Sequence, residues 1–208
     1  YFIVNQSAGS VDDWVTLQHK GSEALILDPM TGQCGRATMR SVDGKAQVYL
    51  QLASGESRFV RFEKVAPGQG QWPIWESKSQ PRLVEGRWEV TFLQGGPVIP
   101  SPTSIDSLGS WTEFGSDDVT SFAGTARYRI EVEVPAALAT ASLLSLGDVR
   151  ESARVRWNGE EVQTLVANPY QCVVRNVRGG KNVLEIDVTN LSANRIRDLD
   201  RRKVEWRK

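Results

Sequence analysis

Apolar and polar residues alternate along much of the chain, and the alternation is most regular from residue 125 to residue 134. One face of this stretch carries Ala126, Tyr128, Ile130, Val132 and Val134. The positions between them are charged: Arg127, Arg129, Glu131 and Glu133. A period of two predicts a strand with one face on a core and the other in water. Because a slip of one residue would expose the whole apolar face, we expect a firm register.

Shorter stretches of the same kind occur throughout the sequence. In the second half, strands are predicted at residues 88–92, 143–146, 155–157, 172–174 and 184–188, with 143–146 and 172–174 as core strands. In the first sixty residues they are predicted at 2–4, 14–17, 24–27, 48–52 and 59–62. Asn158-Gly159 predicts a two-residue hairpin. Helical periodicity is almost absent, so the expected fold class is all-β, a β-sandwich or jelly roll.

The alternation stops at residues 66–73, which hold two prolines and two glycines. Such a composition is typical of a linker. We therefore predict a small β-sandwich at residues 1–65, a linker at 66–85 and a larger jelly-roll β-sandwich at 86–208.

The net charge of the chain and the length of its apolar runs limit the classes of partner that it could bind. The 208 residues include 25 Lys and Arg against 25 Asp and Glu, whereas nucleic acid and anionic membranes attract a clustered basic excess. We expect no nucleic-acid and no membrane partner, since no apolar run approaches the ~20 residues of a membrane span. The chain opens at Tyr1 and stops at Lys208, just after a new pattern starts, so we expect a piece of a longer protein.

Few residues are available for nucleophilic or metal chemistry. Cys34 and Cys172 either pair or stay as buried small apolar residues, and their strand-like surroundings favour the second. His19 is the one histidine and lies in a polar turn, where a solvated role is favoured over a catalytic one. The GxSxG, Walker and HExxH motifs are absent. No catalytic residue is predicted.

The seven tryptophans fall into groups according to their phase with neighbouring residues. Trp88 and Trp157 are in phase with apolar residues and are predicted in the core. Trp72, Trp75 and Trp111 do not fit the alternation of any predicted strand. For these three, contact with a ligand and packing between the modules both stay possible roles. A flat aromatic face matches the C–H face of a pyranose, which makes an exposed tryptophan a candidate sugar contact.

Three loop-like regions offer polar side chains. Asp117 and Asp118 follow Gly115-Ser116, and such carboxylates can hold a structural Ca²⁺, although a solvated turn is favoured. No other cofactor is expected. The polar stretches 168–170 and 190–195 could bond sugar hydroxyls or tie loops down.

Several motifs occur in an order that resembles a known family. The second half holds FAGTARY at 122–128, LGDVRESARV at 146–155, WNG at 157–159, GKNVLEIDVTN at 180–190 and NRIRDLD at 194–200. These resemble the galactose-binding-like jelly roll of large glycoside hydrolases, and their order is most similar to the α-L-rhamnosidases of glycoside hydrolase family 106. YFIVN at 1–5, DPMTG at 28–32 and LQLASGES at 50–57 resemble the small β-sandwich that precedes this jelly roll.

The resemblance implies a non-catalytic accessory region at the C-terminal end of a bacterial glycoside hydrolase. In that family the catalytic carboxylates lie on an upstream (β/α)₈ barrel. This chain would either support that barrel or present polysaccharide to it. The matched positions are structural there: Gly124 and Gly147 would relieve backbone crowding, and Arg195 would fasten a loop. The family also implies a periplasmic or extracellular location.

Two alternatives stay open. The first is a stand-alone carbohydrate-binding module with its own pocket, because related jelly rolls bind sugars through loops at one end, often with Ca²⁺ nearby. Its candidate residues are Trp111, Asn158, Tyr170 and Arg195 for sugar, and Asp117 and Asp118 for Ca²⁺. The second is a structural domain that contacts another protein. The expected partner is accordingly polysaccharide or the parent catalytic domain.

Overall fold

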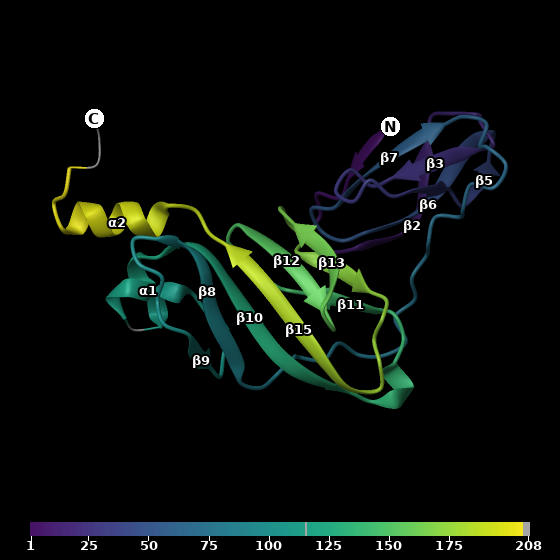
Figure 1. The fold of residues 1–208 in the computed structure, drawn as a ribbon. Coiled ribbons are helices and arrows are strands. Elements are labelled where there is room, and N and C mark those ends of the chain that lie inside the picture. The colour runs from purple at the N-terminus through teal and green to yellow at the C-terminus, as the bar shows by residue number, and fades with distance from the viewer. Residues whose placement is uncertain (115, 206–208) are drawn as a thin grey trace. The chain divides into compact units, whose positions relative to one another are not determined.

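The structure is a computed structural model that describes residues 1–114 and 116–205 (Figure 1). Antiparallel strands make up most of it and the helices are short, which confirms the all-β prediction. The chain divides into two compact units, Tyr1–Pro81 and Arg82–Lys208. Across the described ranges no helix is both long and apolar enough to cross a membrane. Gly115 of the predicted loop and Trp206 lie outside the described residues.

The first unit consists of two antiparallel sheets. One has the order β1 (Phe2–Val4), β7 (Ser57–Phe62), β3 (Ala24–Leu27) and β4 (Cys34–Arg36). The other has the order β2 (Val11–Leu17), β6 (Lys45–Leu52) and β5 (Met39–Val42). Their inner faces share one apolar core that includes Ile26, Val48, Leu50 and Val60.

Strand β6 shows why this sequence forms a sheet with one buried face and one solvent-exposed face. Ala46, Val48, Leu50 and Leu52 are buried, and the residues between them face outward. Asp43-Gly44 closes the β5–β6 hairpin, and both residues have positive φ angles, 52° and 72°. This conformation is the one that a two-residue turn requires.

The first part of the predicted linker is bound to the first unit. The Trp72 amide donates to the Arg36 carbonyl at 2.9 Å, and the Arg36 amide donates to the carbonyl of Gly70 at 2.8 Å. The guanidinium of Arg58 lies over the Trp72 ring, 5.4 Å from its centroid. At Gly35 a Cβ atom would come within 2.8 Å of the Trp72 backbone, so only glycine allows this close approach.

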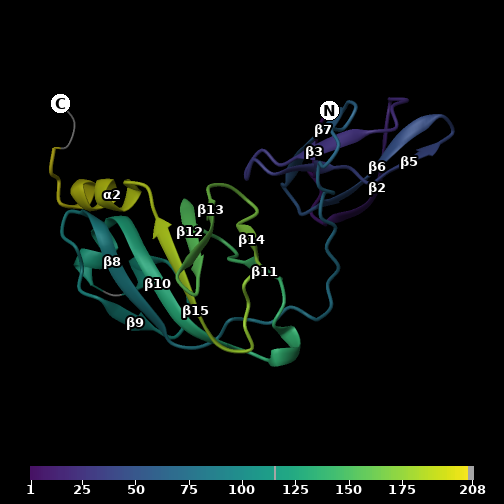
Figure 2. The same cartoon turned by 45° about the vertical axis from the view of Figure 1, so that its right-hand side comes forward.

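The second unit is built on a six-stranded antiparallel sheet. Its order is β13 (Glu160–Leu165), β12 (Ser152–Trp157), β15 (Gly180–Thr189), β10 (Ala123–Val134), β8 (Trp88–Gly96) and β9 (Thr103–Ile105). A two-stranded sheet of β11 (Ser142–Ser145) and β14 (Gln171–Val174) adds residues to the same core (Figure 2). The helical elements are η1 (Trp111–Glu113), α1 (Asp117–Ser121), η2 (Ala136–Leu138) and α2 (Ala193–Arg201).

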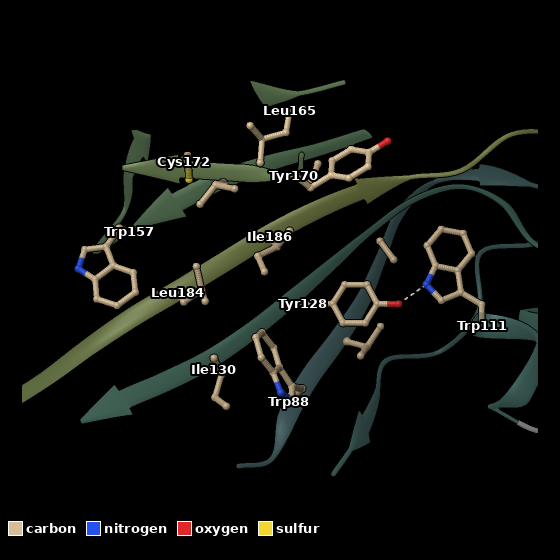
Figure 3. Packing of buried hydrophobic residues seen from close by; sticks show 14 of the residues in the cluster. Trp88, Trp111, Tyr128, Ile130, Trp157, Leu165, Tyr170, Cys172, Leu184 and Ile186 are labelled. Atoms are coloured by element: carbon tan, nitrogen blue, oxygen red, sulfur yellow. Dashed lines mark hydrogen bonds between the residues drawn. The ribbon is translucent and has the colours of Figure 1, made fainter. Parts of the chain in front are cut away.

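The core of this unit confirms the main sequence predictions. Strand β10 places Ala126, Tyr128 and Ile130 inward, beside the predicted core residues Trp88 and Trp157 (Figure 3). The predicted hairpin joins β12 to β13, and its two turn residues have φ angles of 52° and 82°. The apolar side chains from the inner face of the large sheet and from β14 form one cluster.

Several predictions were wrong in detail. Strand β11 is at the predicted place, but Leu143 is 66% exposed, because a two-stranded sheet has an outer face as well as a core face. Strands β4 and β5 were not predicted. Residues 193–195 were predicted as loop and form the start of α2, so Arg195 is helical. Asp117 and Asp118 lie in the first turn of α1 rather than in a loop.

Candidate functional site

Trp111, the first predicted sugar contact, is part of the core. Its indole packs against the rings of Phe92 and Phe122, with centroid distances of 5.9 Å and 5.5 Å. Its Nε1 donates to the hydroxyl of Tyr128 (Figure 3). Burial raises the pKa of Tyr128 to about 12, although the bond from Trp111 acts in the opposite direction. Only 6% of Trp111 is exposed, so a sugar could stack on it only if the core opened.

Tyr170 and Asn158 also make structural contacts. The Tyr170 side chain is buried, and its hydroxyl donates to the Glu151 carbonyl at 2.7 Å. The Asn158 side chain accepts from the Val183 amide at 2.8 Å and donates to Asn182 Oδ1 at 3.0 Å. Asn182 is 1% exposed, and sequence reasoning had not singled it out. Both predicted residues therefore hold strand ends and a hairpin in place.

Arg195 and the two aspartates lie on neighbouring helices. Arg195 Nη1 is 3.5 Å from Asp198 Oδ2 on the same helix, and α2 contacts α1, which carries exposed Asp117 and Asp118. Among the residues that the structure describes, no group of three His, Cys, Asp or Glu side chains could hold a metal ion. A calcium role for the aspartates stays a prediction.

The structure does not bring these candidates together into one site. Thr189 pairs with Thr125 and Ser152, which marks one end of the large sheet, and α1 and α2 connect to that end. Trp157 pairs with Leu184 toward the other end, and Asn158 follows it. In Figure 3, Trp157 and Trp111 lie at opposite sides of the core. A single pocket lined by all the predicted sugar contacts is therefore not formed.

The outer face of the large sheet carries a charge network. Asp187 Oδ1 accepts from Arg127 Nε at 2.7 Å, and Asp187 Oδ2 accepts from Arg156 Nη1 at 2.6 Å. Burial works to raise the pKa of Asp187, but the two arginines outweigh it and hold this pKa below its ordinary value. Arg127, Arg156, Glu185 and Asp187 thus all have close partners of opposite sign, which is the arrangement of a stabilising network.

A second polar surface lies on the first unit, on the outer face of its three-stranded sheet. Seven side chains from the central part of this face form what we call the polar-aromatic face: Asp12, Trp14 and Thr16 of β2, Arg40 of β5, and Gln47, Tyr49 and Gln51 of β6. Lys45 projects from the same side of β6, beside the β5–β6 turn. Cross-strand register aligns them in rows, with Asp12 opposite Gln51, Trp14 opposite Tyr49 and Thr16 opposite Gln47.

The side chains of this face contact one another in a chain. The Tyr49 hydroxyl donates to Asp12 Oδ1 at 2.8 Å, and its ring meets the Trp14 indole edge-on, 5.3 Å between centroids. The Arg40 guanidinium lies over the same indole at 4.2 Å and donates from Nε to Gln47 Oε1 at 2.6 Å. The bond to Asp12 raises the pKa of Tyr49, and desolvation and nearby acidic charges act in the same direction.

One more aromatic residue borders the face. The amide side chain of Gln51 donates to the Trp75 carbonyl at 2.7 Å and accepts from the Trp75 amide at 2.8 Å, which fixes this segment beside β6. The Trp75 side chain is 41% exposed. The alternation of residues 45–52 could have revealed the outward row, because four apolar positions leave Gln47, Tyr49 and Gln51 on the opposite side.

The cysteines and the histidine are placed as follows. Both cysteines are free thiols, and Cys172 is buried as predicted whereas Cys34 is exposed, because β4 is a short edge strand. His19 is exposed, as expected, and its ring stacks on Phe62 at 3.8 Å. Its Nδ1 accepts from the Gly21 amide at 2.8 Å, which is a turn contact.

Comparisons with known proteins relate the chain to parts of larger glycoside hydrolases. No protein-family model matches the sequence. The chain is 35% identical over 192 residues to a Formosa agariphila protein named "Putative beta-glucuronidase", covering 88% of this chain and 16% of that protein. The rhamnosidase from Novosphingobium sp. PP1Y superposes with a TM-score of 0.77 and 28% identity, over 96% of this chain and 19% of its own. The chain is glycoside hydrolase-related. It spans less than a fifth of either relative.

Proposed function

We propose that this chain is a non-catalytic accessory region of a larger bacterial glycoside hydrolase of the α-L-rhamnosidase type. The observation that carries the proposal is the match to a rhamnosidase over 96% of this chain, although that match covers only 19% of the rhamnosidase. Almost the whole chain thus corresponds to one part of such an enzyme. The ordered motifs of residues 122–200 support family 106 and the C-terminal side of a catalytic barrel.

The second unit has features of a region that supports a neighbouring domain. Val98 and Ile99 follow β8, and Leu191 follows β15. All three side chains are more than half exposed. Gly96 pairs with Ala123, and the ends of β8 and β15 therefore lie at the same end of the sheet. Exposed apolar residues gathered at one end favour contact with another part of the protein.

The proposed partner is thus the parent catalytic domain, with polysaccharide as its substrate. A periplasmic or extracellular location belongs to the same proposal and is supported by the family resemblance. The interior of the second unit supports a scaffold role, because Trp111 and Tyr170 are buried and bonded rather than open to a ligand.

An activity assay tests the proposal. We expect the 208-residue chain to show no turnover of 4-nitrophenyl α-L-rhamnoside or 4-nitrophenyl β-glucuronide. The longer protein that contains it should cleave one of them and should lose thermal stability when residues 1–208 are deleted. Turnover by the chain alone that a single Asp or Glu substitution abolishes would contradict the accessory role.

A protein-interaction domain without any sugar partner is the second candidate, and the exposed apolar residues Val98, Ile99 and Leu191 favour it. The deletion experiment separates the two. If the longer protein keeps its stability and activity without residues 1–208 while the isolated chain captures a separate protein, the second candidate holds.

A further inference from the structure

We propose that the polar-aromatic face of the first unit binds a neutral glycan chain. This inference goes beyond the accessory role, because it assigns a ligand and a surface, and it does not depend on what reaction the parent protein catalyses. The candidates predicted from sequence lie in the second unit, whereas this face lies on the three-stranded sheet of the first.

The aromatic part of the face suits a sugar ring. Tyr49 meets Trp14 edge-on, with an interplanar angle of 73°, and both side chains are partly exposed, although the Arg40 guanidinium covers one face of the Trp14 indole. The Trp75 side chain is 41% exposed at the border of the same sheet. A pyranose presents C–H groups on one face, which pack on aromatic rings that carry partial negative charge.

The polar part suits sugar hydroxyls, which both donate and accept hydrogen bonds. The face offers carboxylate oxygens at Asp12, a hydroxyl at Thr16 and an amide at Gln47. Arg40 uses Nε for Gln47, and within the described residues no hydrogen-bond acceptor is assigned to its two terminal nitrogens. These nitrogens can donate to a ligand without breaking a contact already made.

The face is ordered before any ligand arrives. Gln47 donates from Nε2 to Thr16 Oγ1 at 2.8 Å and accepts from Arg40, so one amide ties three strands together. The bond between Tyr49 and Asp12 joins β6 to β2 in the same way. Side chains held in place lose little conformational entropy on binding, which favours affinity for a polar but uncharged ligand such as a neutral glycan.

Charge favours a neutral glycan over a polyanion. Arg40 is the one cation among the seven side chains that define the face, and Asp12 balances it, while Lys45 lies at the end of the same outward row. The charges of Asp13 and Glu76 also act on Tyr49 and make the surroundings more acidic. With Arg40 and Lys45 set against Asp12, Asp13 and Glu76, this surface has no basic excess that would attract a polyanionic glycan. From Asp12 to Thr16 the strand extends about 14 Å, which leaves room for more than one sugar ring.

The other sheet of the first unit provides a competing surface and matched controls. A hollow of about 490 Å³ is lined by residues that include Tyr1, His19, Phe59, Arg61 and Phe62. Phe59 and Arg61 are exposed on β7, as Tyr49 and Arg40 are accessible on the three-stranded sheet. Each test variant on the polar-aromatic face therefore has a matched control on β7. Phe59→Ala is the control for Tyr49→Ala, and Arg61→Ala is the control for Arg40→Ala.

The experiment titrates the full 208-residue chain with xylohexaose, cellohexaose, a β-1,4-galactan hexasaccharide and, as a charged probe, a galacturonate hexasaccharide. Backbone and indole N–H signals are followed by NMR, and affinity is measured by calorimetry. We expect a neutral hexasaccharide to shift signals of β2, β5 and β6. Arg40→Ala and Tyr49→Ala should each weaken binding by about tenfold or more, because a few central contacts carry most binding energy.

Each outcome decides the question. The controls Phe59→Ala and Arg61→Ala should leave affinity unchanged, and loss of binding in these variants alone would assign the ligand to the hollow and overturn the proposal. Gln47→Ala, which removes a different contact of the face, should also weaken binding and serves as a second variant in case Tyr49→Ala fails to fold. Silence with all neutral probes, preference for the galacturonate, or self-association through the face in ultracentrifugation would each overturn it. None of these results depends on enzymatic activity, so the accessory role is judged separately.

Discussion

Asp187 shows at the scale of one residue how a charged side chain stabilises this fold. It is 8% exposed and accepts hydrogen bonds from Arg127 and Arg156, which lie on the strands that flank β15. We expect Asp187→Asn to lower the free energy of unfolding by about 2 kcal/mol at pH 7, since bonds to charged groups contribute more than neutral ones and two half-buried cations lose their partner. Urea denaturation measures this change.

The pH dependence of that effect follows from the lowered pKa of Asp187. A carboxyl whose pKa is lower in the folded state stabilises the protein fully above its unfolded pKa, and the effect is lost as pH falls through the folded value. The wild type should therefore lose this contribution below about pH 4, and Asp187→Asn should lose less over the same interval. Asp148→Asn is the control, because its pair with Arg150 is exposed, and it should leave the midpoint unchanged. Equal effects of both variants would contradict the assigned role.

The two cysteines should differ in reactivity. Burial raises the pKa of the Cys172 thiol to about 11, and Cys34 is exposed on an edge strand. Because the thiolate is the reactive form, we expect Ellman's reagent at pH 8 to label Cys34 within minutes and Cys172 only after unfolding. Cys34→Ser should remove the fast phase. Failure to label either thiol in denaturant without reductant would instead indicate a disulfide.

At the scale of elements, the close crossing of β8 and β10 gives a sharp prediction. A Cβ atom at Gly124 would lie 2.1 Å from the Gln94 carbonyl oxygen, whereas one at Gly96 would meet nothing within 4 Å. We expect Gly124→Ala to destabilise the chain by about 3 kcal/mol or more, because backbone atoms cannot yield, and Gly96→Ala to cost much less. Thermal unfolding compares the two, and similar melting temperatures would show that the strands can separate there.

The space around an added Cβ atom also tests the role that the family resemblance implied for Gly124 and Gly147, which was to relieve backbone crowding. Crowding explains Gly124, as expected from the resemblance. Gly147 has no heavy atom within 4 Å of an added Cβ atom, and its φ angle is +70°. The conformation of its backbone, rather than lack of space, therefore favours glycine at this position.

Long alternating strands could be predicted from the sequence, and short or charged elements could not. Strand β10 has twelve residues with a clear period, whereas β4 has three residues centred on Gly35. Helix α2 has nine residues, and its apolar positions, Ala193, Ile196 and Leu199, recur over too few turns to stand out among the charged residues between them. Pairs such as Arg202 with Asp198 at 2.6 Å support the helix. The polar-aromatic face depends on cross-strand register, which brings Asp12 and Tyr49 together although 37 positions separate them.

At the scale of the whole molecule, the segment between the two units should be the most accessible to protease. Residues 76–83 are exposed and contain no strand or helix, and Lys78 and Arg82 offer trypsin sites on either side of the Pro81 boundary. Each unit has its own apolar core, so each should survive cleavage. We expect brief trypsin treatment, followed by mass spectrometry, to give two fragments that end or begin near these residues and keep their β-sheet circular dichroism after separation. Lys78→Gln with Arg82→Gln should slow this cut, whereas Lys20→Gln in a turn of the first unit should not. Rapid loss of either fragment would show that its core needs the other unit to stay folded.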